Sequence, residues 1–263
     1  MTLVKHELRQ SRSSLIIWTA AIAFLMIICV LMYPEMKGEM DGVSDMFASM
    51  GSFTQAFGMD RISFGTLIGF YAVEGGNILG LGGAFFASLI AISALAKEEK
   101  ERTAEFLLTH PIGRAQVVTE KLAAVLLQIL VMNAVIWLLS VGSIALIGEQ
   151  IPWTELNLLH LSYLLLQIEL AGICFGISAF LRRGSLGIGL GIAAMLYFLN
   201  LIANLSDRAE FLKYLTPFGY TEGADIVANS SLDAPMVLLG MGYAAVGIAA
   251  AYWKYCRKDI QSA

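Results

Sequence analysis

Charged residues are scarce in this chain. Asp, Glu, Lys and Arg make up 14% of its 263 residues, whereas 57% of the residues are hydrophobic. An ordinary soluble domain carries about 25% charged residues. Because so few charges cannot cover the surface of a soluble protein of this size, much of the surface must face lipid. The sequence therefore predicts an integral membrane protein whose surroundings are the lipid bilayer.

The chain also lacks the motifs of common catalytic and metal sites. It contains no G-x-x-x-x-G-K-[ST] loop for nucleotide phosphates and no H-E-x-x-H zinc motif. Its three cysteines include no C-x-x-C pair and indicate no disulfide framework. Gly176-Ile177-Ser178 has the form of part of an intramembrane serine protease site, but no histidine follows His160 to act as the base. We expect no enzymatic activity, no metal, no cofactor bound by this chain and no nucleic-acid partner.

Long apolar segments account for the hydrophobic composition. A helix needs about 20 mostly apolar residues to cross the hydrocarbon core of a bilayer. The first such segment has no charged residue from Leu15 to Tyr33, and no signal-peptide cleavage site follows it, so we expect it to remain as a span. The sequence predicts an all-α polytopic bundle, a single domain over residues 1–263. Its six expected transmembrane helices are residues 14–33, 75–96, 122–147, 158–181, 186–203 and 236–253.

Three segments beside these spans have an apolar pattern of their own. Residues 3–9 predict an N-terminal amphipathic helix at the inner interface, with a frayed terminus as the alternative. Residues 62–73 precede the interruption Glu74-Gly75-Gly76-Asn77 and predict a separate interfacial or re-entrant piece. Residues 204–235 form an outer segment in which short helices would lie on or dip into the outer interface.

Lysine and arginine are distributed unevenly along the chain. If the N-terminus is placed inside, the inner segments hold thirteen of the 17 basic residues. The outer segments hold only Lys37, Arg61, Arg208 and Lys213. Because cytoplasmic loops retain positive charge, we predict a multi-pass protein of the cell membrane, bacterial in pattern, with both termini in the cytoplasm.

Polar residues inside apolar spans are costly and often functional. Glu169 lies midway along the fourth span and is the clearest case. Helical spacing places three small residues on its face: Ser162, Gly172 and Gly176. The other candidates for a substrate pathway are Gln128, Asn133 and Asn77. The sequence leaves two interpretations open, an interhelical hydrogen bond made by a protonated or paired Glu169, and a role in moving substrate or protons.

Two glycines of the fifth span, Gly187 and Gly191, form a small-xxx-small pair. Such a pair lets helix backbones approach closely. It predicts tight packing inside the bundle, with a contact between two chains as the alternative.

The inner segment at residues 97–121 reads KEEKERTAEFLLTHPIGRAQVVTEK. Charged residues fill its first half, and Phe106, Leu107 and Leu108 give it an apolar face. Pro111 is well placed at the first turn of a new helix. We therefore predict a short amphipathic helix on the cytoplasmic side, where a solvated charged loop is the alternative. A rigid element at this place would suit a docked cytoplasmic partner.

This segment resembles the signature of the type-2 ABC exporter permeases. In that family a Glu leaves the second span, followed by Thr-x-Glu-x-Leu-Leu, Pro-x-[SG]-Arg and a Lys before the third span. The number and orientation of the spans agree with the same family, and the size and pattern are similar to bacterial permeases for peptide antibiotics and other toxic compounds. The matching positions here are Glu101, Thr103, Glu105, Leu107, Leu108, Pro111, Gly113, Arg114 and Lys121.

The resemblance implies a half-transporter. Two permease chains, identical or related, would form a pathway for export of an amphipathic or hydrophobic compound. A separate cytoplasmic ABC ATPase subunit would dock on each chain and would bind the ATP and Mg²⁺. The coupling residues would be Glu101, Thr103, Glu105, Phe106, Leu107, Leu108, Pro111 and Arg114. Two other classes stay open, a proton-coupled secondary transporter or channel subunit that uses Glu169, and a membrane scaffold or immunity protein without transport.

Overall fold

A computed structural model of the chain describes residues 2–37, 51–56, 61–63, 65–97, 113–181 and 185–257. Every regular element within these ranges is a helix. Six helical stretches are long and apolar enough to cross a membrane. This confirms the predicted all-α polytopic bundle, and it agrees with the rule that a spanning helix satisfies its backbone hydrogen bonds within its own segment.

Five of the six stretches are single helices, and one is composite. The single helices are α1 (Thr2–Lys37), α8 (Arg114–Leu146), α9 (Trp153–Ser178), α10 (Leu186–Leu205) and α12 (Ala234–Arg257). The composite stretch joins α4 (Leu67–Gly75), the π-helical segment η2 (Gly76–Leu81) and α5 (Gly82–Ser93). Four shorter helices lie between the spans: α3 (Ser52–Ala56), η3 (Asp207–Leu215), η4 (Pro217–Tyr220) and α11 (Gly223–Asn229).

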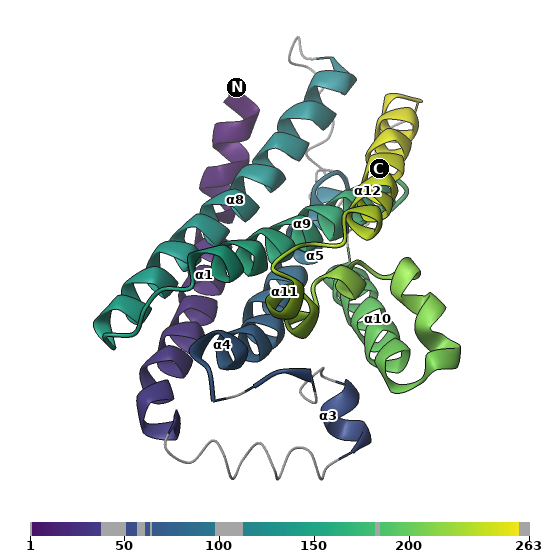
Figure 1. Cartoon of the computed structure of the whole chain (residues 1–263). Helices are drawn as coiled ribbons and strands as arrows, with labels where there is room; N and C mark the ends of the chain where they lie inside the picture. The colour runs from purple at the N-terminus through teal and green to yellow at the C-terminus, as the bar shows by residue number, and fades with distance from the viewer. Residues whose placement is uncertain are drawn as a thin grey trace.

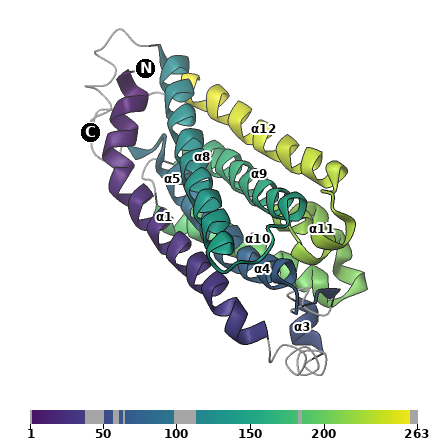
Figure 2. The ribbon, with the colours of Figure 1, turned by 60° about the vertical axis from the view of Figure 1, so that its left-hand side comes forward.

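Helix α9 is the centre of the bundle. It is the most buried span, with 67% of its most apolar stretch inside the protein, against 17% for α12 at the periphery. Figure 2 shows α1 and α12 on opposite sides, with α8 and α9 between them. The N-terminus of α1, the start of α8 and the end of α12 lie at one end of the bundle (Figure 1). We call this the N-terminal end, and the other the far end.

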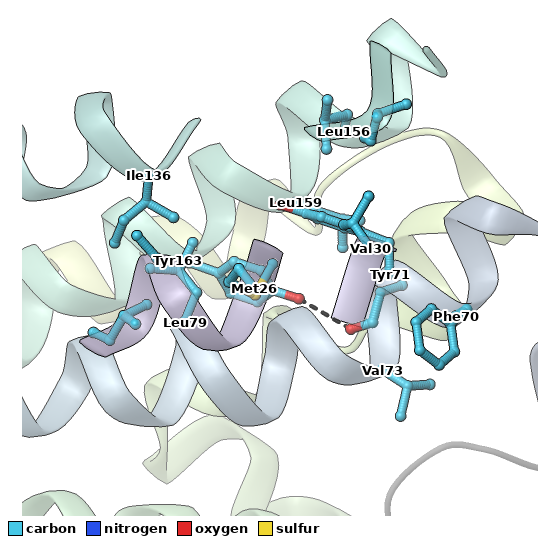
Figure 3. Close-up of a cluster of buried hydrophobic side chains, with 14 of the residues drawn as sticks. Met26, Val30, Phe70, Tyr71, Val73, Leu79, Ile136, Leu156, Leu159 and Tyr163 are labelled. Atoms are coloured by element: carbon cyan, nitrogen blue, oxygen red, sulfur yellow. Dashed lines mark hydrogen bonds between the residues drawn. The ribbon is translucent and has the colours of Figure 1, made fainter. Parts of the chain in front are cut away.

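The apolar side chains divide between an outward face and an interior. Large residues such as Phe24, Leu138 and Val246 are exposed, as expected of a surface that meets lipid. One interior cluster gathers hydrophobic side chains of several spans, with aromatic residues among them, as Figure 3 shows. In that cluster the fully buried Tyr163 of α9 donates a hydrogen bond to the backbone carbonyl of Ala72, 3.2 Å away. The cluster therefore ties α4 to the central helix.

The N-terminal residues form the predicted helix, and this helix runs directly into the first span. Residues 3–9 are the first turns of α1, which continues without a break into the first span. No proline or glycine interrupts the chain before the apolar run, and Leu3 is buried against α8 and its neighbours. The predicted helix is therefore confirmed, and contacts with the bundle join it to the first span.

The interruption predicted at Glu74-Gly75-Gly76-Asn77 is also absent. The helix continues through η2 into α5, so residues 67–73 belong to the second span and are not a separate piece. Two of the glycines lie beside a buried aromatic ring. A Cβ atom built on Gly75 or on Gly80 would lie 3.4 Å from the Tyr163 ring. A contact at this distance is an ordinary van der Waals contact, and the helix continues through these glycines.

The outer segment 204–235 contains η3, η4 and α11, and its middle part folds into the bundle. Every residue of η4 is buried. Just before η4, the hydroxyl of Thr216 donates a hydrogen bond to the carbonyl of Leu196 in α10, 2.8 Å away. This inward turn places polar groups of the outer segment against the spans.

Candidate functional site

The predicted coupling segment joins the second span to α8. Arg114 is the first residue of α8 and is partly buried. Lys97, which follows α5, lines one cavity together with Glu7 and Lys121, so the segment leaves and rejoins the bundle at its N-terminal end. The other predicted coupling residues lie outside the described residues: Glu101, Thr103, Glu105, Phe106, Leu107, Leu108 and Pro111.

The start of α8 is bonded to the start of α1. The Glu120 carboxylate accepts hydrogen bonds from the backbone N–H groups of Leu3, at 3.1 Å, and Val4, at 3.3 Å. A carboxylate in this position caps the free N–H groups of a helix and complements its dipole. One residue further, Lys121 forms an ion pair with Glu7 across 2.9 Å, and the Lys121 side chain is only 1% exposed. The first turns of α8 are therefore joined to the first turns of α1 by hydrogen bonds and an ion pair.

Glu169 lies on the face of α9 that meets α12. Its side chain is buried and accepts a hydrogen bond from the hydroxyl of Tyr220 in η4 at 3.0 Å. A Cβ atom on Gly240 of α12 would collide with the Glu169 carboxyl group, and a Cβ atom on Gly172 would lie 2.7 Å from the Cβ atom of Ala244. The small and polar stripe noted in the sequence is thus the close contact between α9 and α12.

Asn133 belongs to a different polar group. Its Nδ2 atom donates to Oε1 of Gln167 in α9, at 2.6 Å, and to the carbonyl of Ile129, at 2.9 Å. Gln167 in turn donates from Nε2 to the carbonyl of Leu79 in η2, 3.3 Å away. This chain of bonds joins α8, α9 and the π-helical segment. A π-helical turn inside a span often marks a functional position.

Gln128 and Asn77 occupy two further places. Gln128 donates from Nε2 to the Ala124 carbonyl of its own helix at 3.0 Å. Asn77 lies in η2 and accepts a hydrogen bond from the hydroxyl of Tyr197 in α10 at 3.1 Å. Among the described residues, no hydrogen bond joins any two of the four predicted pathway residues, Glu169, Gln128, Asn133 and Asn77.

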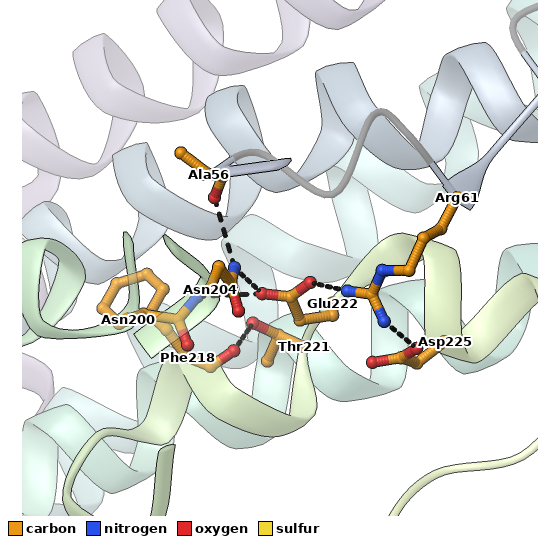
Figure 4. Close-up of polar contacts among 8 residues, drawn as sticks. All are labelled: Ala56, Arg61, Asn200, Asn204, Phe218, Thr221, Glu222 and Asp225. Atoms are coloured by element: carbon orange, nitrogen blue, oxygen red, sulfur yellow. Dashed lines mark hydrogen bonds and ion pairs between the residues drawn. The ribbon is translucent and has the colours of Figure 1, made fainter. Parts of the chain in front are cut away.

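A polar cluster at the far end was missed by the sequence analysis. The Glu222 side chain, 6% exposed, pairs with Nη2 of Arg61 at 2.9 Å. It also accepts hydrogen bonds from Nδ2 of Asn200, at 3.1 Å, and from Nδ2 of Asn204. Arg61 reaches the exposed Asp225 of α11 with its other nitrogen at 2.7 Å (Figure 4). The cluster joins three parts of the chain at the far end: the segment before α4, helix α10 and the start of α11.

The basic residues that break the inside bias gave a signal for such contacts. Lys37 pairs with Glu149 at 2.7 Å, and Arg61 pairs with Glu222 and Asp225. All three acids lie in segments that the sequence analysis placed outside. Two of the four basic residues on the side that lacks basic residues therefore marked an ion pair between outer segments. Tyr220 and Gln167 gave no comparable signal.

Two further features concern a small cavity and the residues that could bind a metal. A small cavity of about 60 Å³ adjoins the Glu222 cluster and is lined by Asn77, Tyr197 and Asn200 among others. In the part of the chain that the structure describes, no three His, Cys, Asp or Glu side chains come together to hold a metal ion.

Comparison with known proteins gives one informative match. A search of curated proteins found none that matches. The family described as "ABC-2 family transporter protein" matches residues 1–260, which is almost the whole chain. The match agrees with the bundle of six apolar spans. The chain belongs to the ABC-2 transporter family and is a multi-pass membrane component of an ABC transporter.

Proposed function

We propose that the chain is the permease subunit of an ABC exporter. Two permease chains would enclose the pathway, and a separate cytoplasmic ATPase on each would drive export of an amphipathic or hydrophobic compound. The observation that carries the proposal is the family match over residues 1–260. The coupling motif between the second and third spans, Glu101 to Lys121, supports it.

The inner contacts suggest how ATP hydrolysis would reach the spans. An ATPase that moved residues 97–113 would pull on the first turns of α8. Those turns hold α1 through Glu120 and through the pair of Lys121 and Glu7. The first and third spans would then respond together. The acidic residues of the coupling segment would meet basic residues of the ATPase, and its apolar face would pack in a groove.

The uneven distribution of basic residues indicates how the proposed transporter lies in the membrane. With the N-terminal end in the cytoplasm, the Lys121–Glu7 pair lies inside and the Arg61–Glu222 cluster lies outside. The outer cluster would act as the closed external end of the pathway. A pathway that opens to the outside would have to separate α10 from α11 and break these bonds.

A second permease chain has free helical surface to contact. A Cβ atom on Gly191 would meet no described atom within 4 Å, and one on Gly187 would meet only the Ser185 hydroxyl. The expectation that this pair packs tightly inside the bundle was wrong, because the neighbouring Gly189 provides the contact to Ser88 and Ile92 instead. The uncovered face of α10 supports a contact between chains.

The ABC assignment also bears on the alternatives. Membership in the ABC-2 family favours an ATP-driven permease over a proton-coupled secondary transporter and over a scaffold without transport. Glu169 then needs no proton-carrying role, since its hydrogen bond with Tyr220 and its contact with Gly240 explain a polar residue at that depth.

Reconstitution tests the proposal. The chain would be purified alone and together with a co-expressed ABC ATPase, and both preparations would be placed in vesicles. We expect ATP hydrolysis and ATP-dependent movement of amphipathic dyes only in the complex. ATP hydrolysis that stays with the isolated chain through stringent purification, or transport driven by a proton gradient without ATP, would contradict the assignment.

A further inference from the structure

The N-terminal end of the bundle contains a cavity of about 310 Å³ between α1, α5, α8 and the first residue of α10. Small-molecule sites in proteins have volumes of about 300–1,000 Å³. The cavity is therefore large enough for a small amphiphile. Glu169 and the residues of the Glu222 cluster are not among the residues that line this cavity.

The lining of the cavity changes along its length. Its charged residues, Glu7, Lys97 and Lys121, lie nearest to the N-terminal end. Its other end has an apolar wall that includes Trp18, Leu89 and Val125. From Lys121 to Gln128 the wall formed by α8 is about 10 Å long at 1.5 Å per residue. A ligand in this cavity would need one charged end and an apolar body.

Among the described residues, the charge at the opening is positive. Glu7 is matched by Lys121, 2.9 Å away. Lys97 makes no hydrogen bond or ion pair with any described residue, so it is the one charge of the lining that is not matched there. A partly buried ammonium group at the opening of an apolar cavity favours an anion over a neutral group or a cation.

A second polar residue lies in the wall of the cavity. Gln128 lines the cavity and is 4% exposed. Its Nε2 atom is used by the Ala124 carbonyl, but its Oε1 atom accepts no hydrogen bond from the described residues. A buried acceptor without a donor is unfavourable. A ligand with an N–H or O–H group in its body would satisfy it.

We infer that this cavity binds an anionic amphiphile, with its negative group at Lys97, its apolar body against Trp18, Leu89 and Val125, and a donor group toward Gln128. The direction of loading rests on the proposed function, in which the opening faces the cytoplasm and the inner leaflet. The ligand is either the exported compound or an anionic membrane lipid, since both present the same chemistry.

Photolabelling of the full chain tests this site. The chain would be placed in phosphatidylcholine nanodiscs with a diazirine-bearing dodecanoate, or with the matching dodecanol and dodecylamine at equal concentration in the membrane. Labelled peptides would be mapped by mass spectrometry. We expect the acid to label the residues around the cavity about tenfold more than the alcohol or the amine, a ratio typical of one charge-assisted hydrogen bond.

Variants then test whether the preference for the acid arises at Lys97 in this cavity. Lys97→Gln should abolish the preference for the acid. Lys254→Gln should leave it unchanged, because Lys254 lies on α12 near the same end but outside the cavity. Ser14→Phe, and independently Ser93→Phe, should lower labelling by filling the cavity. Each variant must show the wild-type elution profile in size-exclusion chromatography.

The outcomes separate this inference from the proposed function. Labelling requires no ATPase, so equal labelling by acid, alcohol and amine, or a preference that survives Lys97→Gln, overturns the inference even if transport is intact. Two results support it and identify the source. ATP-dependent movement of the acid by the complete transporter indicates cargo. Displacement of the label by phosphatidylglycerol, without movement of the acid, indicates a lipid.

Discussion

The Tyr220 hydroxyl donates a hydrogen bond to the Glu169 carboxyl group across 3.0 Å, and this bond fixes η4 to the middle of α9. Burial, followed by the nearby Glu169 carboxyl group, raises the pKa of the Tyr220 hydroxyl far above its usual value. The hydroxyl therefore stays protonated and remains a donor. Since Gly240 of α12 lies directly over the same carboxyl group, Glu169 joins three elements at one point.

A substitution at Glu169 should show whether polarity or charge matters. Glu169→Gln keeps an acceptor for Tyr220, so transport should remain near the wild-type level. Glu169→Leu leaves the buried Tyr220 hydroxyl unpaired, which costs about 1–3 kcal/mol, and should lower the melting temperature and the yield. Thermal melting and vesicle transport would be measured together. A Gln variant that folds normally but does not transport would instead indicate proton coupling or direct substrate contact.

The ion pair between Glu7 and Lys121 should contribute more than an exposed pair. Breaking a buried pair costs about 3–5 kcal/mol, and we expect the lower end because Glu7 is 14% exposed. Glu7→Lys should lower the melting temperature, and the double reversal with Lys121→Glu should restore most of it. The same reversal at Lys37 and Glu149, which are 49% and 32% exposed, is the matched control and should change little. Equal effects at both pairs would contradict a structural role of the inner contact.

The two carboxylates that contact Arg61 should differ in their effect. Asp225 is 49% exposed, so Asp225→Asn should fall within about 1 kcal/mol of the wild type. Glu222 is 6% exposed and holds Arg61, Asn200 and Asn204, so Glu222→Ala should cost about 2 kcal/mol or more. Hydrogen exchange in residues 207–229 would measure the local opening. Faster exchange in the Asp225 variant than in the Glu222 variant would contradict the proposed closure.

The spans could be predicted from the sequence because their cause is local. An uncharged run such as Leu15 to Tyr33 needs no distant contact to be identified as a span. The partners of the buried polar residues could not be predicted, because they are far apart in the chain. Tyr220 reaches Glu169 from 51 residues away, after an inward turn that no local pattern of residues 204–235 indicates.

Gln167 and Glu169 lie on opposite sides of α9. Two residues along an α-helix differ by about 200°, so these side chains point to opposite sides of α9. Glu169 faces η4 and α12, whereas Gln167 faces α8 and η2. A search for polar residues on one face therefore excludes Gln167. The glycines near η2 predicted an interruption for a different reason. Glycine disfavours an isolated helix, whereas here the helix continues through the glycines inside the bundle.

Reporter fusions would test the orientation. Fusions after Gln150 and Ser230 should report the outside, because both residues lie in segments joined by outer contacts, such as the hydrogen bond from Ser230 to Glu155 at 3.1 Å. Fusions after Gly184 and Ala263 should report the cytoplasm. A cytoplasmic signal at Ser230 would contradict the six-span arrangement.

The last prediction concerns the coupling segment. If residues 97–121 dock on an ATPase, truncating one member of a buried charge pair there should cost about 2–5 kcal/mol. In a solvated loop the same change should stay within about 0.5 kcal/mol. We therefore expect Glu105→Ala and Glu101→Arg to detach or uncouple the ATPase while the chain still folds. Leu108→Asp should act in the same way, because it places an unpaired charge on the apolar face.

Co-purification of the ATPase and substrate-stimulated hydrolysis in vesicles would measure the effect. Glu210→Ala is the control, because Glu210 is an exposed acid of η3 in the outer segment and should leave both measurements unchanged. An effect confined to the coupling variants indicates a specific interface, whereas an equal loss in the control indicates general destabilisation. If all three coupling variants bind the ATPase and transport at the wild-type level, residues 97–121 are not the coupling element, and the ATPase must contact another inner surface.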